Sequence, residues 1–136
     1  SYANHNVDFL SALDIQAEPL NGQFIFKLKL SDCISTVRIS SDIDKFNLST
    51  RFPVLIENAA FNHAVIDIFL QKVYSPTIYL YNDNENNSIF FEYTMFLPFN
   101  EDQVAKMVKW FDQVVLQFRE DYKRLVKEFK EKQNVN

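Results

Sequence analysis

The feature that most constrains this chain is a long apolar stripe in its last third. Its members follow one another at alternating spacings of four and three residues: Val104, Val108, Phe111, Val115, Phe118, Tyr122, Leu125 and Phe129. This spacing is typical of one face of a continuous α-helix that packs on other parts of a protein. The helix also has a marked start, because Asn100 and Gln103 stand where a capping box requires them. We therefore predict a helix of about 30 residues that begins at Glu101.

This helix is longer than the strands of an ordinary sheet. At about 1.5 Å per residue it extends roughly 45 Å, whereas a strand of five or six residues spans about 17 to 20 Å. The end of the stripe, at Tyr122, Leu125 and Phe129, therefore needs a further cover. Either a helix near the N-terminus of the same chain or a second copy of the protein would supply it. Because the end of the stripe needs such a cover, we predict a homodimer.

Five segments carry the signs of β-strands. The alternation is clearest over residues 23–30, where Phe24, Phe26, Leu28 and Leu30 share one face and lysines occupy the other. The other four segments are residues 36–41, 45–51, 77–81 and 88–97. An Asn-rich stretch, residues 82–87, separates the last two and predicts a hairpin turn.

Two further helices complete the expected order. Residues 7–15 have apolar positions at helical intervals before Pro19, and residues 54–70 follow Pro53, which suits the first turn of a helix. The chain is then a single α+β domain over residues 1–136, with the order α-β-β-β-α-β-β-α. Its antiparallel sheet has about five strands packed by helices, the last of which is long.

Composition excludes several classes of function. The net charge of −4 disfavours a nucleic-acid binder, and the one glycine, Gly22, disfavours a phosphate-binding loop. The one cysteine, Cys33, excludes a disulfide framework and a multi-cysteine zinc site. No apolar run approaches the ~18 to 20 residues that span a bilayer, so we expect no membrane partner. We also expect a cytoplasmic location. Because the sequence begins at Ser1, removal of a targeting segment stays open.

The polar residues form no catalytic or metal-binding constellation. His63 and Asp67 are one helical turn apart, and without a nucleophile this spacing favours a surface ion pair. Asp83, Glu85 and Asn87 alternate as calcium ligands do, but the glycine and the closing glutamate of a calcium loop are missing. We therefore predict no catalytic residues, no metal and no cofactor.

Apolar residues instead suggest a binding surface. In the strand over residues 88–97, Phe90 and Phe96 lie on the face opposite Ile89 and Phe91, where a partner or another element would cover them. Together with the end of the helical stripe they form the expected partner-binding or dimer surface: Phe90, Phe96, Phe118, Tyr122, Leu125 and Phe129.

Nearly the whole chain takes part in a resemblance to a known family, and residues 88–118 are its clearest part. Over residues 88–118 the strand SIFFEYTMFLPF runs directly into the capped helix NEDQVAKMVKWFDQVVLQF, after a helix that ends IDIFLQKV and a short strand TIYLYND. This pattern, with the element order, resembles the type III secretion chaperone-like fold and in particular the bacterial YbjN-family domains, candidate regulators of sensory transduction. The resemblance implies a small non-enzymatic domain of a bacterial protein, commonly dimeric, that acts through protein contacts. Secretion chaperones of this fold bind extended segments of their partners.

Two functions follow as expectations. The first is a non-enzymatic protein-interaction module, chaperone-like or regulatory, which binds an unknown partner protein as a homodimer through exposed apolar surface. The second is a carrier for a small apolar ligand, held in a cavity between the sheet and the long helix. The first predicts apolar side chains on the surface, and the second predicts an enclosed pocket.

Overall fold

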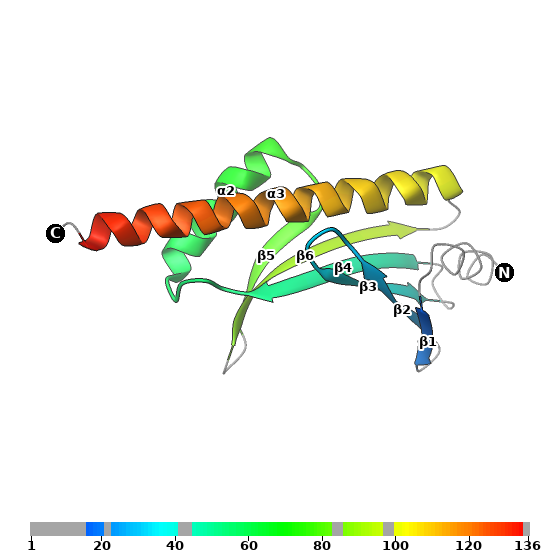
Figure 1. The fold of residues 1–136 in the computed structure, drawn as a ribbon. Helices are drawn as coiled ribbons and strands as arrows, with labels where there is room; N and C mark the ends of the chain where they lie inside the picture. The colour runs from blue at the N-terminus through cyan, green and yellow to red at the C-terminus, as the bar shows by residue number, and fades with distance from the viewer. Residues whose placement is uncertain (1–15, 21–22, 41–44, 83–85, 97–99, 135–136) are drawn as a thin grey trace. The chain divides into compact units, whose positions relative to one another are not determined.

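The computed structural model confirms the α+β class and adds one strand to the sheet (Figure 1). It describes residues 16–20, 23–40, 45–82, 86–96 and 100–134. The elements are β1 (Gln16–Leu20), β2 (Gln23–Lys29), β3 (Ile34–Ser40), β4 (Lys45–Pro53), α2 (Ala59–Lys72), β5 (Thr77–Asn82), β6 (Asn87–Phe96) and α3 (Glu101–Asn134). The strands form one six-stranded sheet in the order β1-β2-β3-β4-β6-β5. The helix expected over residues 7–15 lies outside the described residues.

The strand that the sequence did not predict is β1. It pairs antiparallel with β2, and Pro19 stands opposite Phe24. Proline has no N–H to give to a strand ladder, so it argues against a central strand. β1 is at the edge of the sheet and needs hydrogen bonds on one side only, which is why proline is tolerated there.

The second helix begins later than Pro53 predicts. Pro53 is the last residue of β4, residues 54–58 form a loop, and α2 starts at Ala59. The cap explains the position, because the Asn58 side chain accepts a hydrogen bond of 3.0 Å from the Phe61 N–H. Asparagine satisfies an unpaired N–H of the first turn, whereas Pro53 only permits a helix to begin. The prediction that this helix begins at residue 54 was therefore wrong, because residues 54–58 form a loop before it.

The start of α3 is confirmed at the predicted residue. The Asn100 side chain accepts a hydrogen bond of 2.8 Å from the Gln103 N–H, and the Asn100 N–H donates one of 3.2 Å to the Gln103 side chain. This is the reciprocal arrangement of a capping box. None of the described helices is long and apolar enough to cross a membrane.

The described chain groups into two compact units, each of which takes pieces from distant parts of the sequence. Unit 1 comprises the described residues up to Thr50 and those between Glu92 and Asp112. Its core consists of alternating residues from the strands and one stripe of α3: Phe26, Leu28, Leu30, Val37, Ile39, Phe46, Leu48, Val104, Met107 and Phe111. The turn after β2 is joined to α3, since the backbone N–H and the hydroxyl of Ser31 both donate to Asp112, at 2.9 and 2.6 Å.

Unit 2 comprises residues 51–91 and 113–136, with α2, β5 and most of α3. Its core is a cluster of aromatic rings around Phe118, which is fully buried. The Phe118 ring lies 5.1 to 6.1 Å, between centroids, from four others: Phe52, Phe69, Phe91 and Tyr122. Such ring contacts add to the free energy of apolar burial.

Candidate functional site

A buried tyrosine fixes the loop between β4 and α2. The Tyr122 side chain, on α3, is 0% exposed, and its hydroxyl donates a hydrogen bond of 2.7 Å to the Asn62 side-chain oxygen on α2. The same hydroxyl accepts a hydrogen bond of 3.0 Å from the Leu55 N–H. The Asn62 amide nitrogen in turn donates to the Ile56 carbonyl oxygen at 2.9 Å. One phenol and one amide thus satisfy two backbone groups of the loop and hold it beside both helices.

The loop is also fixed from the side of the sheet. The Val54 N–H donates to the Asn87 carbonyl oxygen at 3.0 Å, and the Asn87 side chain donates to the Glu57 carboxylate at 2.8 Å. Hydrogen bonds therefore hold successive residues of this loop in place, while the Leu55 side chain remains 43% exposed. A large apolar side chain presented on a well-anchored loop is a feature of binding surfaces.

Burial also keeps the Tyr122 phenol protonated. Loss of solvent raises the pKa of Tyr122 above its ordinary value, and the hydrogen bond from the Leu55 N–H offsets part of this rise. The protonated hydroxyl can therefore donate to the Asn62 side chain while it accepts from the Leu55 N–H. These two hydrogen bonds connect Tyr122 with the loop and with α2.

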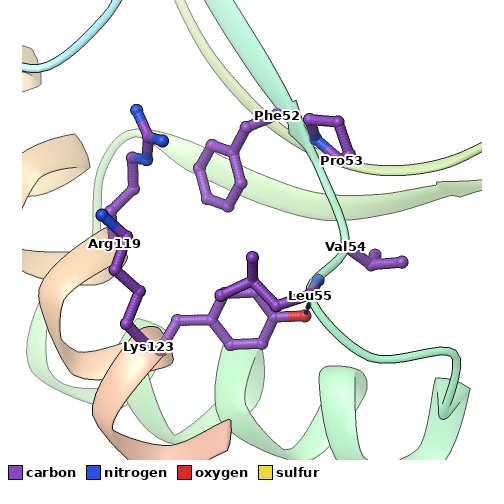
Figure 2. A pocket seen from close by; sticks show the side chains of 7 residues that line it. Phe52, Pro53, Val54, Leu55, Arg119 and Lys123 are labelled. Atoms are coloured by element: carbon purple, nitrogen blue, oxygen red, sulfur yellow. Dashed lines mark hydrogen bonds between the residues drawn. The ribbon is translucent and has the colours of Figure 1, made fainter.

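A pocket of about 160 Å³ opens beside this loop (Figure 2). The chain from Phe52 to Leu55 forms one side, and Arg119 and Lys123 of α3 face it from the other side. The Arg119 guanidinium lies over the Phe52 ring at 4.9 Å from its centroid. This cation–π contact places a positive charge at the wall of an otherwise mostly apolar pocket.

A second, more open hollow of about 390 Å³ adjoins the pocket and shares Leu55 and Lys123 with it. We call it the Leu55 groove; the residues that line it are Leu55, Lys123, Val126, Lys127, Lys130, Glu131 and Asn134. Val126 is nearly fully buried and, with Leu55, gives the groove its apolar part. The three lysines follow one another at helical intervals along one side of α3, where they outnumber the single Glu131.

Phe90, which was expected on the binding surface, is partly covered by neighbouring side chains. On the strands of unit 2 its ring stacks on Tyr79 at 5.3 Å, meets Tyr81 edge-on at 5.3 Å, and lies under the Arg51 guanidinium at 5.6 Å. Phe90 is therefore half-buried by residues of its own chain. Phe96, in unit 1, is 69% exposed, as expected of a surface residue.

The end of the helical stripe has a cover that the sequence did not predict. Phe118 and Tyr122 are fully buried in the single chain, so they are core residues and cannot form a contact surface. Leu125 is half-buried, and the half-buried Phe129 ring packs on Phe61 of α2, with 4.6 Å between centroids. The covering element is α2, which was not one of the two candidates (Figure 1).

The sequence prediction missed the Leu55 groove because it placed residues 54–58 inside a helix. The pattern that would have revealed the loop is the N-cap at Asn58, three residues before Phe61. His63 and Asp67 are both exposed on α2. Among the residues that the structure describes, no three His, Cys, Asp or Glu side chains gather closely enough to hold a metal ion. Asp83 and Glu85 lie outside the described residues.

Comparisons with known proteins bear on the fold. No family model matches the sequence, and no curated protein matches it. Among solved structures, the chain is similar to YbjN from E. coli, described as a candidate transcription regulator, with a TM-score of 0.65 and 11% identity over 85% of this chain and 86% of that one. It is also similar to an uncharacterized protein from Methanothermobacter thermautotrophicus, with a TM-score of 0.65 and 14% identity over 91% of this chain and 98% of that one. The fold is therefore YbjN-like, as the resemblance implied.

Proposed function

We propose that this chain is a non-enzymatic protein-interaction module, chaperone-like or regulatory, which binds a partner protein at the Leu55 groove. The observation that carries the proposal is an exposed apolar side chain, Leu55, beside an open groove on a loop whose backbone is held by Tyr122, Asn62 and Asn87. A preformed site loses little conformational entropy when a partner binds, and this favours affinity. The description of YbjN as a candidate regulator agrees with a role of this kind.

Homodimerisation stays a prediction. Its first argument was the uncovered end of the stripe, which α2 covers through Phe61. The exposed Phe96 and the half-buried Leu125 are the members of the expected surface that still offer apolar area to a second copy. Light scattering over a concentration series checks it: a mass of twice 16.1 kDa supports the dimer, and a constant 16.1 kDa contradicts it.

The alternative, a carrier for a small apolar ligand, is not favoured by any specific feature of the site. Such a carrier needs enclosed apolar space between sheet and helix. In unit 2 the rings around Phe118 occupy this position, and the larger of the two hollows described above is open and lined by lysines. We therefore propose binding of a protein and not storage of a ligand.

Selection from a displayed library of random short peptides tests the proposal. We expect the protein to enrich peptides that bind at the groove. The groove is already formed in the isolated chain, so any peptide with a suitable apolar residue can bind it. Leu55→Ser should lower their affinity by about tenfold, equivalent to about 1.4 kcal/mol. The matched control is Ile68→Ser, which removes a similar exposed side chain, 56% exposed, from α2. Absence of enrichment, or equal effects of the two variants, would contradict the proposal.

A further inference from the structure

The charges around the Leu55 groove point to the chemistry of its partner. Lys123, Lys127 and Lys130 line it, against the single carboxylate of Glu131. The nearby Arg124 belongs to a different group, since its guanidinium pairs with Asp121 at 3.6 Å and with Glu128 at 3.4 Å. The positive charge of the groove is therefore not balanced by the residues that line it. This is notable in a chain whose net charge is −4.

The apolar part of the groove restricts the partner further. Val126 and Leu55 lie among the lysine side chains, whose stems add apolar surface beneath their charged ends. A hollow of about 390 Å³ accommodates a few side chains of a bound segment. A partner that fits it places an apolar residue against Leu55 and Val126 and carboxylates near the three lysines.

Other anionic partners fit less well. A nucleic acid or an anionic membrane attracts a protein over a long range through net positive charge, whereas this chain is acidic overall. A stable dimer buries about 800 Å² on each subunit, which is more than a groove of this kind provides alone.

On the basis of the function proposed above, we propose that the Leu55 groove binds an acidic segment of a partner protein, with an apolar residue of that segment seated against Leu55 and Val126. Carboxylates of the segment pair with Lys123, Lys127 and Lys130 at the margin of the groove. Such exposed pairs each contribute about 0.2 to 1 kcal/mol and weaken as salt is added. The apolar residue gives the base affinity, and the charges select among partners.

Two labelled peptides test this inference by fluorescence anisotropy. The first is a synthetic peptide of Leu-Glu-Glu repeats, and the second has every Glu replaced by Gln. We expect the full-length protein to bind the Glu peptide about tenfold more tightly at low salt, with the difference shrinking at high salt. The double variant Lys123→Glu with Lys127→Glu should remove this preference, so that the protein no longer binds the Glu peptide more tightly than the Gln peptide.

The matched control is Lys106→Glu with Lys109→Glu, which makes the same change of charge at exposed positions earlier on α3. It should keep more of the affinity for the Glu peptide than the groove variant does, because Lys106 and Lys109 do not line the groove. Equal losses in both double variants would overturn the inference, since they would reflect net charge alone. Circular dichroism confirms that each variant is folded.

The remaining outcomes separate this inference from the function on which it rests. If library peptides bind through Leu55 but the Glu peptide gains nothing over the Gln peptide, the acidic partner is wrong and the interaction module stands. If no peptide binds at all, both are wrong. Lysine-dependent binding to vesicles of phosphatidylcholine and phosphatidylserine, in place of peptide binding, would overturn the inference in favour of a lipid surface. A dimer that the groove variants dissociate would overturn it in favour of a second copy.

Discussion

Two asparagines of this chain organise hydrogen bonds of the same kind in opposite surroundings. In unit 2, Asn62 is 2% exposed and connects the Tyr122 hydroxyl with the Ile56 carbonyl oxygen. In unit 1, the half-exposed Asn47 on β4 donates to the Glu92 carboxylate at 2.9 Å and to the Thr94 hydroxyl at 3.0 Å on β6. Each amide joins two elements of its unit, yet water reaches only one of the two readily.

The comparison shows that the contribution of a side-chain amide to stability depends on its surroundings. When a substitution removes the amide, its former hydrogen-bond partners either bind water or stay unsatisfied. Near Asn47, water replaces the lost amide at little cost. Near Asn62, the Tyr122 hydroxyl would lose its acceptor and the Ile56 carbonyl its donor at a site that water reaches less readily, which costs about 1 to 3 kcal/mol for each group. Asn62 also holds the loop that presents Leu55, so its substitution should lower the affinity for a partner as well as the stability.

The largest effect is expected from Asn62→Ala. The substitution removes the amide that accepts from the Tyr122 hydroxyl and donates to the Ile56 carbonyl, and we expect the free energy of unfolding to fall by about 2 to 4 kcal/mol in urea denaturation. A fall of less than about 0.5 kcal/mol would show that water enters the site freely and would remove the distinction between the two asparagines.

Tyr122→Phe should have an intermediate effect. The ring keeps its contacts with Phe118, and only the hydroxyl is lost, so we expect a fall of about 1 to 2 kcal/mol in the free energy of unfolding. Because the Leu55 N–H loses its acceptor, the loop should also exchange its amide hydrogens faster. If hydrogen exchange at residues 54–57 is unchanged, the phenol does not position the loop.

The pH dependence of stability should separate the wild type from the same variant above pH 10. The pKa of Tyr122 is higher in the folded than in the unfolded chain, mainly through burial. The unfolded chain therefore loses this proton first, and the stability that the phenol contributes declines as the pH rises from about 10 toward the folded pKa. Urea denaturation at pH 8 and at pH 10.5 or above should show the gap between wild type and Tyr122→Phe narrowing. A constant gap would mean that the phenol titrates alike in both states.

The smallest effect is expected from Asn47→Ala. Solvent replaces the amide at the Glu92 carboxylate and the Thr94 hydroxyl, so the free energy of unfolding should change by no more than about 0.5 kcal/mol. The measurement is the same urea denaturation as for Asn62→Ala. A loss as large as that of the buried asparagine would refute the argument from exposure.

Local signals in the sequence predicted those parts of the fold that local interactions determine. The start of α3 depends on Asn100 and Gln103, three residues apart, and was confirmed. The alternation in β2 and β3 likewise placed Phe26, Leu28, Val37 and Ile39 on the buried side of their strands. β1 was missed, since the edge position that tolerates Pro19 is a property of the sheet and not of the segment.

The candidate site was less predictable because it depends on contacts between distant residues. Tyr122 meets Asn62 across 60 positions of sequence and Leu55 across 67. Tyr122 and Leu125 occupy equivalent positions in the spacing of the stripe. Only the structure shows that Tyr122 is fully buried whereas Leu125 is half-buried. To predict the groove from the sequence, one would need to know where α2 begins and which element packs against α3.

The grouping of the chain into two units has a consequence for its evolution. β4, β6 and α3 each begin in one unit and end in the other, with the changes after Thr50, Phe91 and Asp112. No single cut in the sequence therefore releases either unit with all its pieces, and recombination at one crossover point cannot exchange one unit for a foreign copy.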